Sequence, residues 1–271
     1  MCLAVLALGA HPQLPLVIAA NRDEFHAREA QAAHWWASGV LAGKDLVAGG
    51  TWFGVNASGR WALVTNFREG VPRDPSAPSR GDLVMRALGD AAPPLVCAAA
   101  IAAEGERYHG FSLLVGTRQE AAYLSNRASG AIALGPGIYG LSNHLLETPW
   151  PKLVLSKKRL AAWVEAKSVE AEALFELLGD RRKAERAELP ATGVSTDWER
   201  LLSSPFIVDP RYGTRCSTVL TIAADGRARF EERSFDVQGR EDQRALFEFE
   251  LRPAPAAPAV HARPDAASTL R

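Results

Sequence analysis

The stretch MCLAVLALGAHPQLPLVIAANRDEF, residues 1–25, decides the fold. Two apolar runs, Leu3–Leu8 and Leu14–Ala20, lie on either side of a turn that contains His11. Short apolar runs bounded by turn residues predict buried β-strands, here an antiparallel pair. No basic residue precedes the first run, and His11 interrupts it, so the pattern favours a strand pair over an export signal.

Four polar residues, Asn21–Glu24, end the second predicted strand. Strand alternation places Asn21 and Asp23 on one face and Arg22 and Glu24 on the other. Because the two strands pair, we expect this cluster to lie near the N-terminus. Arg22 and Asp23 can reach one common site only if the strand ends or bulges there. The simpler alternative is a solvated strand end.

Cys2 is the sharpest chemical feature of the sequence. A methionine before a small residue is usually removed, which would make Cys2 the first residue of the mature chain. An α-amine, with an ordinary pKa of about 8, would then share a residue with a thiol of ordinary pKa about 8.5. Such a residue contains its own nucleophile and base, as N-terminal nucleophiles do. The alternative is a cysteine with no part in chemistry.

The rest of the chain alternates between hairpin and helix patterns. Further strands are predicted at residues 51–56, 60–66, 111–117, 120–126, 215–223 and 227–234. Helices are predicted after the cap residues Ser79 and Ser168, and at Pro94 and Pro151. Residues 181–199 are charged and are predicted to be mostly loop.

Antiparallel hairpins together with a central block of helices predict an α+β fold. No stretch in the middle of the chain has the composition of a linker. We therefore expect a single domain over residues 1–251. The Pro/Ala-rich residues 252–271 are predicted to form a flexible tail.

Composition narrows the function classes. The chain has 271 residues, with 31 lysines and arginines against 31 aspartates and glutamates, so its formal net charge is zero. A neutral chain has no general attraction to nucleic acid, and we expect no nucleic-acid partner. No apolar run reaches the length of a membrane span, about 18 residues, so we expect no integral membrane segment. The oligomeric state stays open.

The cysteines and histidines exclude further classes. Three cysteines without CxxC spacing, Cys2, Cys97 and Cys216, argue against a disulfide framework and fit a reducing, cytoplasmic compartment. Cys97 lies among alanines and is predicted to be a buried structural thiol. The sequence has no paired histidines at metal-ligand spacing, so no metal site is predicted.

After Cys2, four segments occur in a fixed order: ANRDEFHAR, GTWFGVNASGRWALVTNFRE, GLSNHLLETPWPK and YGTRCSTVL. Together they resemble the NRDE family, which is named for residues 21–24 and includes the eukaryotic transport and Golgi organisation protein two. The resemblance extends to about Phe249. Position 216 is often serine in the family, whereas here it is Cys216.

The resemblance implies the N-terminal nucleophile hydrolase fold, a four-layer αββα sandwich. Several positions are also similar to the choloylglycine and penicillin V acylases, in which the mature chain begins with the catalytic cysteine. On that resemblance Cys2 is the nucleophile and Asp23 orients its amine. Asn66 and Asn143 lie near the oxyanion hole, and Arg215 lies near the thiol.

One position departs from those acylases. They carry an arginine three residues before the aspartate, where this chain has Ala20, and Arg22 is adjacent to Asp23 instead. Either Arg22 takes over from a different backbone position, as a further catalytic residue, or the site is altered. Four more residues are predicted to bind ligand: Asn21, Glu24, Trp52 and His144.

Two functions therefore compete. The first is an amidase or acylase that cleaves a linear amide through an acyl-cysteine intermediate at Cys2 and requires no cofactor. The second is a carrier or trafficking protein that holds a small-molecule or lipid-like ligand in the same pocket without turnover. The family resemblance suggests haem or acyl-coenzyme A as that cargo, and an imidazole such as that of His144 suits haem.

Overall fold

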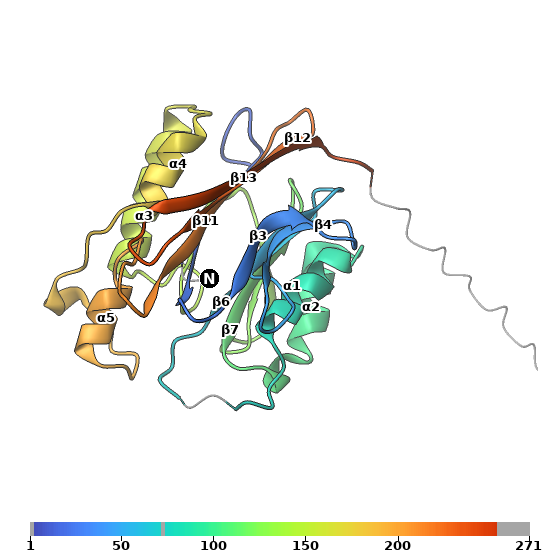
Figure 1. Cartoon of the computed structure of the whole chain (residues 1–271). Coiled ribbons are helices and arrows are strands. Elements are labelled where there is room, and N and C mark those ends of the chain that lie inside the picture. Colours follow the sequence, from blue (N-terminus) through green and yellow to red (C-terminus); the bar gives the residue numbers. More distant parts are fainter. Residues whose placement is uncertain (1–2, 72–73, 254–271) are drawn as a thin grey trace, which may run out of the picture.

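The computed structural model describes residues 3–71 and 74–253 and contains two stacked antiparallel sheets (Figure 1). The first sheet has six strands in the order β10-β1-β2-β11-β12-β13, and the second has seven strands, β3 to β9, in sequence order. The six strands are β1 (Leu3–Leu8), β2 (Leu16–Phe25), β10 (Gly137–Leu141), β11 (Tyr212–Ile222), β12 (Arg227–Phe235) and β13 (Glu241–Glu250). The seven are β3 (Ala30–Trp35), β4 (Val40–Asp45), β5 (Phe53–Asn56), β6 (Trp61–Asn66), β7 (Phe111–Gly116), β8 (Ala121–Ser125) and β9 (Ala131–Leu134).

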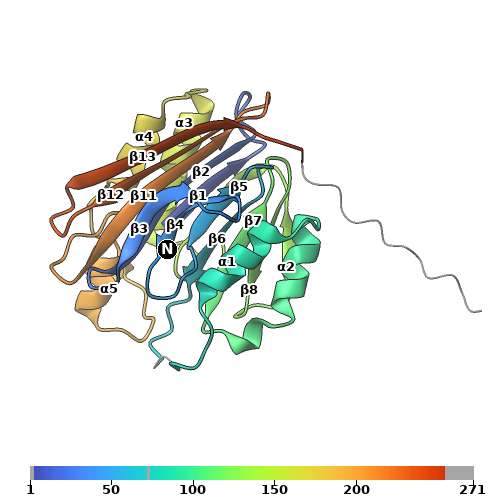
Figure 2. The same ribbon diagram turned by 45° about the vertical axis from the view of Figure 1, so that its right-hand side comes forward.

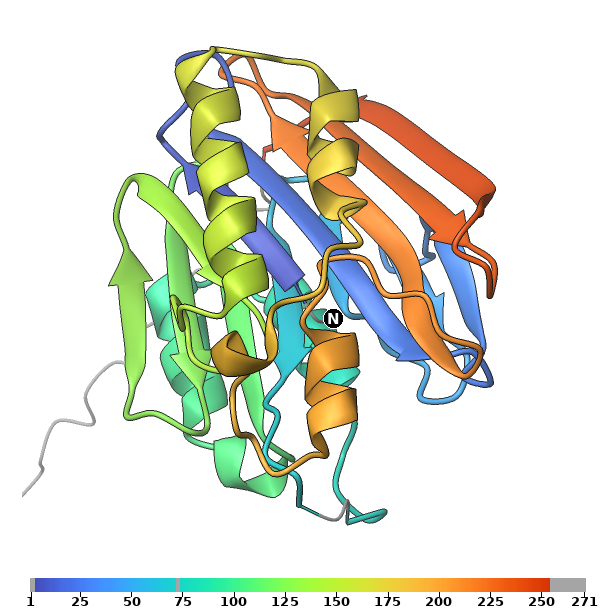
Figure 3. The same ribbon diagram turned by 90° about the vertical axis from the view of Figure 1, so that its left-hand side faces the viewer.

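Helices cover the outer face of each sheet. Helices α1 (Arg80–Gly89) and α2 (Pro94–Ala102) pack on the seven-stranded sheet (Figure 2). Helices α3 (Pro151–Glu165) and α4 (Ala171–Leu178) pack on the six-stranded sheet, and α5 (Thr196–Leu202) lies beyond their ends (Figure 3). Short 3-10 turns occupy Gly105–Arg107 and Arg186–Glu188. The layers follow the order helix, sheet, sheet, helix, which confirms the predicted αββα sandwich.

The N-terminal strand pair sets the two faces of the six-stranded sheet. Leu3 pairs with Asn21 and Leu8 pairs with Leu16, as the predicted hairpin requires. Side chains of one parity, such as Leu3, contact α3 and α4, while those of the other parity, such as Leu6, face the second sheet. Both faces are buried, which explains why this pair reads as two continuous apolar runs.

The helix starts were mostly predicted correctly. The Ser79 hydroxyl accepts a hydrogen bond from the Gly81 amide and caps α1, and Cys97 is buried in α2. The expectation that Ser168 caps the next helix is wrong. Its hydroxyl accepts a hydrogen bond from the Glu170 amide, but Glu170 is the cap residue and the helix begins at Ala171, three residues after Ser168.

The sequence patterns missed helix α5 and five strands, namely β3, β4, β9, β10 and β13. Helix α5 lies partly within the charged segment that was predicted to be loop. Strand β13 is an edge strand whose alternate residues Ala245, Phe247 and Phe249 pack against the central core while the residues between them are exposed. Residues 254–271 of the predicted tail lie outside the described residues, so the expected flexibility stays a prediction. Within the described ranges, no helix combines the length and apolarity needed to cross a membrane.

The core between the sheets gives a direct stability prediction. Leu6 is almost fully buried there, so Leu6→Ala removes packing atoms and leaves a cavity. We expect the free energy of unfolding to fall by about 2–5 kcal/mol in chemical denaturation. Val154→Ala, at a helix position that is 53% exposed, is the control and should change it by less than about 0.5 kcal/mol. Equal effects of the two substitutions would contradict this assignment of the core.

Candidate functional site

The candidate site lies where β2, β6 and β10 end. The start of β1 is tied to this place, because Leu3 pairs with Asn21 on one side and Ala4 pairs with Leu141 on the other. Cys2 lies outside the described residues, but in sequence it directly precedes Leu3. Residues that flank this end of β1 are therefore the relevant neighbours of the predicted nucleophile.

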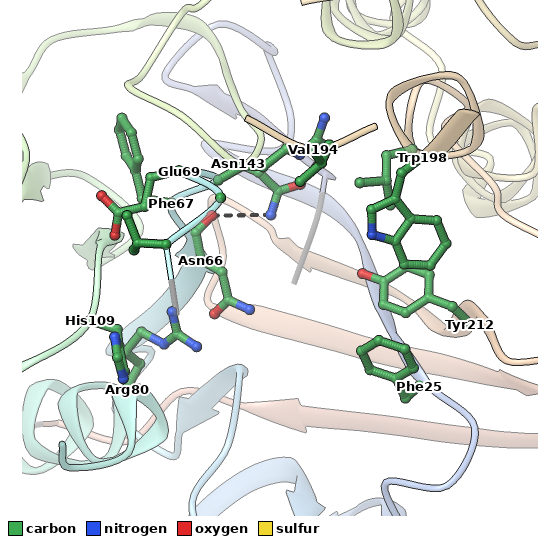
Figure 4. Close-up of a pocket in the computed structure, with 14 residues that line it drawn as sticks. Phe25, Asn66, Phe67, Glu69, Arg80, His109, Asn143, Val194, Trp198 and Tyr212 are labelled. Atoms are coloured by element: carbon green, nitrogen blue, oxygen red, sulfur yellow. Dashed lines mark hydrogen bonds between the residues drawn. The ribbon is translucent and has the colours of Figure 1, made fainter. Parts of the chain in front are cut away.

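Asn66 and Asn143 come together as the resemblance implied. Asn66 is the last residue of β6, and Asn143 follows β10. The Asn143 side-chain amide donates to the Asn66 carbonyl over 3.1 Å (Figure 4), and the Arg68 amide donates to the Asn143 carbonyl over 2.8 Å. The Asn66 side-chain amide makes no hydrogen bond with the described residues and points into the pocket in Figure 4. The backbone of Asn66 is therefore held by Asn143, while its side-chain amide faces the pocket.

Asn21 points away from that pocket. Its side-chain nitrogen donates to the carbonyls of Leu178 and Pro205, each over 2.9 Å, and its oxygen accepts from the Ser217 hydroxyl over 2.6 Å. The residue is fully buried, and both of its amide hydrogens are used. Asn21 lines neither of the cavities described below, so ligand binding by this residue stays a prediction. Its side chain fastens the helical layer to the sheet.

Arg22 points to the opposite face, between the two sheets. Its Nη2 lies 3.1 Å from Asp45 Oδ2, and its guanidinium stacks over the Trp52 ring at 4.5 Å. Its Nη1 is buried and has no hydrogen-bond partner among the described residues. Burial opposes ionisation of Asp45, but bonds from Arg28 and from the Ala48 amide, together with the charges of Arg28 and Arg22, leave the pKa of that carboxyl below its ordinary value. A buried charge thus bridges the two sheets.

Asp23 faces the same side as Asn21, and its carboxylate accepts from the Thr214 hydroxyl over 2.6 Å. The pairing of β2 with β11 shifts register between Thr214 and Cys216, so the irregularity expected near this cluster is present in the partner strand. The Tyr212 hydroxyl donates to the Asp23 carbonyl over 3.2 Å. Asp23 is thereby fixed at the end of the paired part of β2.

Arg215 lies within this register shift. Its Nη1 donates to the carbonyls of Phe25, His26 and Arg28 at 3.1–3.4 Å. Burial and the nearby charge of Arg22 lower the pKa of this guanidinium. Arg215 therefore holds the turn that follows β2, and it does not line either cavity described below. A direct role beside the thiol stays a prediction.

Two cavities meet at Asn66. The first, of about 200 Å³, lies between Asn66 and Asn143 on one side and Phe25, Trp198 and Tyr212 on the other. The second, of about 470 Å³, is more polar. Its wall includes the predicted ligand residues Glu24 and Trp52, with Arg22, Arg28, Asp45 and Arg80.

His144 lies behind the site and lines neither cavity. Its ring packs against Phe67 and Trp150, with centroids 4.5 and 5.8 Å away, and its Nδ1 is 2.9 Å from the Thr148 hydroxyl. Burial and the charge of Arg68 lower the pKa of this imidazole. The structure therefore explains His144 as a packing residue that supports the Asn143 loop.

Sequence reasoning missed the aromatic side of the first cavity. Phe25, Trp198 and Tyr212 come from β2, α5 and β11, so no single segment carries them. One signal was available for α5: Ser195 caps the helix by accepting a hydrogen bond from the Trp198 amide, in the run STDWERLL.

Cys97 and Cys216, the two cysteines other than Cys2, are both buried and form no disulfide in the described part of the chain. Among the described residues, no cluster of histidine, cysteine and carboxylate side chains could hold a metal ion.

Stacked antiparallel sheets covered by helices, with polar residues gathered at the ends of central strands, define the chain as an αββα sandwich protein. The model of the Transport and Golgi organisation 2 family matches residues 1–237. The Transport and Golgi organization protein 2 homologs of Bos taurus and Homo sapiens are 37% and 36% identical to the chain over 239 and 238 residues. Each match covers 81% of this chain and 86% of the relative. The chain belongs to the Transport and Golgi organisation 2 family, which confirms the resemblance seen in the sequence.

A comparison of folds gives a more distant likeness. A mutant conjugated bile acid hydrolase from Clostridium perfringens matches with a TM-score of 0.49 and 7% sequence identity. The match covers 96% of this chain and all of the hydrolase chain.

The cysteines give a labelling prediction. Burial raises the pKa of the Cys97 thiol, and burial together with the charge of Glu232 raises the pKa of the Cys216 thiol well above its ordinary value. Since the thiolate is the reactive form, both should resist alkylation of the native protein near neutral pH. Competitive iodoacetamide labelling with peptide mapping should find Cys2 modified first, and Cys2→Ala should remove the native signal. Faster labelling of Cys97 or Cys216 would contradict the assignment.

The ion pairs of Asp45 give a pH prediction. A carboxyl with a lowered pKa in the folded state stabilises the protein fully above its unfolded pKa, about 3.9, and loses that contribution as the pH falls through the folded value. The stability difference between wild type and Asp45→Asn should therefore shrink below about pH 4 in denaturation experiments. Asp242→Asn, at an exposed position of β13, is the control. Its stability difference from wild type should not change in this way with pH. A difference that stays constant with pH would argue against the Arg22 and Arg28 contacts.

Proposed function

We propose that the protein is an N-terminal cysteine amidase that cleaves a linear amide through an acyl-cysteine at Cys2. The observation that supports this most is the Asn66 side-chain amide, which has no partner among the described residues and lies where two cavities meet. Asn66 is held by Asn143, which follows β10, the strand that pairs with β1. Cys2 directly precedes β1 in the sequence. A donor fixed at that place can stabilise the oxyanion of a tetrahedral intermediate.

The reaction proceeds in two stages. The Cys2 thiol adds to the amide carbonyl, and its proton passes through the α-amine to the leaving nitrogen as the carbon–nitrogen bond breaks. The amine departs and leaves a thioester on Cys2. Water then attacks this thioester, with the α-amine accepting its proton, and the carboxylic acid is released with the thiol restored. Each stage forms one bond to the acyl carbon and breaks one, and no redox partner is needed.

The surrounding residues take defined parts in this proposal. Asp23, fixed by the Thr214 hydroxyl, orients the amine. Asn66 binds the oxyanion, and Asn143 positions Asn66 through its carbonyl. Arg22 supplies a positive charge that favours the thiolate. Strand parity places Arg22 on the same face as Ala20, two residues further along β2, so it can replace the arginine that the acylases carry at the Ala20 position.

One contact favours the alternative, a carrier without turnover. The charge of Arg22 is partly neutralised by Asp45, 3.1 Å away, and a neutralised arginine activates a thiol less. A carrier pocket needs only shape, apolar walls and a few polar anchors. In that case haem or an acyl-coenzyme A would be cargo in the same cavities. For either function we place the protein in the cytoplasm, on the grounds of its isolated cysteines.

Amide hydrolysis by matched variants tests the proposal. Wild type should hydrolyse at least one substrate from a panel of N-acyl amides, and Cys2→Ala should abolish this activity because it removes the nucleophile. Asn66→Ala should lower kcat about 10²–10³-fold, the typical loss for one oxyanion donor. Cys97→Ala, in the core of α2, is the control and should retain activity.

The same experiment distinguishes the carrier. Haem and an acyl-coenzyme A are titrated into wild type and Cys2→Ala in parallel. Saturable binding that is equal in both proteins, without hydrolysis of any amide, would overturn the amidase proposal. Hydrolysis that survives Cys2→Ala would overturn the mechanism.

A further inference from the structure

An aromatic wall, formed by Phe25, Trp198 and Tyr212, faces the two asparagines across the first cavity (Figure 4). Ring centroids are 5.1 Å apart for Phe25 and Tyr212, 5.4 Å for Trp198 and Tyr212, and 6.4 Å for Phe25 and Trp198. Phe25 is 46% exposed although it is a large apolar side chain. Three mutually packed rings that remain open to a cavity form an apolar surface for a ligand.

Two charged groups in the wall of this cavity, Arg68 and Glu69, already have ion-pair partners. Arg68 Nη1 lies 2.8 Å from Glu199 Oε2, and the Arg68 guanidinium stacks on Trp150 at 4.6 Å. Glu69 accepts two hydrogen bonds from Arg127, at 2.7 and 2.8 Å. Neither Glu69 nor Glu199 therefore needs a charged ligand to neutralise it, and the aromatic wall itself offers an apolar surface.

The position of Trp198 is fixed by its neighbour in helix α5. Glu199 is buried and accepts bonds from the Thr192 amide and hydroxyl as well as from Arg68. Arg68 in turn contacts Asn143 through its backbone amide. The aromatic wall and the amide donors are thus held in one framework, and Arg68 and Glu199 act as positioning residues.

The size of the cavity limits what can bind there. Its volume of about 200 Å³ is a little larger than an apolar protein cavity of about 150 Å³ that holds benzene. One ring or a short alkyl chain fills such a space, and a long fatty chain exceeds it. The second cavity, on the other side of Asn66, is larger and has the charged side chains of Arg22, Glu24 and Asp45 in its wall.

We infer that the aromatic wall binds the acyl group of the substrate and restricts it to about the size of one ring or a short chain. The polar cavity then receives the amine part, so the substrate class is an amide between a small apolar acid and a charged amine. The carbonyl lies at Asn66, between the two cavities. This inference rests on the proposed amidase function, because only an amide has an acyl part and an amine part to divide.

Binding to the inactive Cys2→Ala protein tests the inference separately from turnover. The probes are acetylglycine, phenylacetylglycine and dodecanoylglycine, measured by isothermal titration calorimetry. Phenylacetylglycine should bind at least tenfold more tightly than either of the others. When Trp198→Ala is added to the Cys2→Ala protein, the affinity for phenylacetylglycine should fall at least tenfold. The affinity for acetylglycine should change less than twofold. Trp35→Ala is the matched control, because that ring is 39% exposed on β3 and lines neither cavity.

A second variant guards against a folding defect in α5. Phe25→Ala removes an exposed ring at a strand end and should also lower the affinity for phenylacetylglycine. The circular dichroism spectrum should stay unchanged. No binding of any probe at millimolar concentration, or equal affinity for all three, would overturn the inference. So would unchanged affinity in both ring variants. Selective binding of phenylacetylglycine, without hydrolysis by wild type, would support the aromatic wall as a binding surface and would refute only the amidase function.

Discussion

The buried guanidinium of Arg22 is the constraint on which the rest of the site depends. This side chain extends from the six-stranded sheet and contacts Asp45 and Trp52 on the side of the seven-stranded sheet, so a charge is buried between the two sheets. A buried charge destabilises a fold unless it is paired, and breaking such a pair is costly. The neighbouring Asn21 uses the opposite face of β2 to hold the chain before and after α5. Two consecutive residues of one strand thus fasten three of the four layers.

This fastening explains how the site residues come together. With β2 fixed, the shifted register of β11 brings Thr214 to Asp23, and Arg215 holds the following turn through Phe25, whose ring forms part of the aromatic wall. On the other side, Asn143 locks Asn66, and Arg68 joins the same loop to α5. Polar and apolar halves of one pocket therefore share a single hydrogen-bonded frame. That arrangement suits a ligand with two chemically different ends.

The sequence predicted the central part of the fold and not its edges. Continuous apolar runs mark strands buried on both faces, so the β1 and β2 pair could be recognised from residues 1–25. The half-exposed alternation of Ala245, Phe247 and Phe249 is a weaker signal, and β13 was missed. Ordered motifs singled out Asn66 and Asn143, which the structure places in contact. They did not reveal the structural contacts of Asn21, because a polar side chain at a strand end gives no sign of which buried carbonyls it will meet. Trp198 could not be predicted, since its partners Phe25 and Tyr212 are brought to it only by tertiary packing.

Trapping the acyl-enzyme tests the central claim most directly. Wild-type protein is mixed with a reactive thioester of phenylacetic acid, quenched in acid and analysed by intact-protein mass spectrometry and peptide mapping. The account predicts one added phenylacetyl group, on the peptide that begins with Cys2, which decays as water hydrolyses the thioester. It also predicts slower acylation in Asn66→Ala. A stable adduct spread over several cysteines, or no adduct on Cys2, would contradict it.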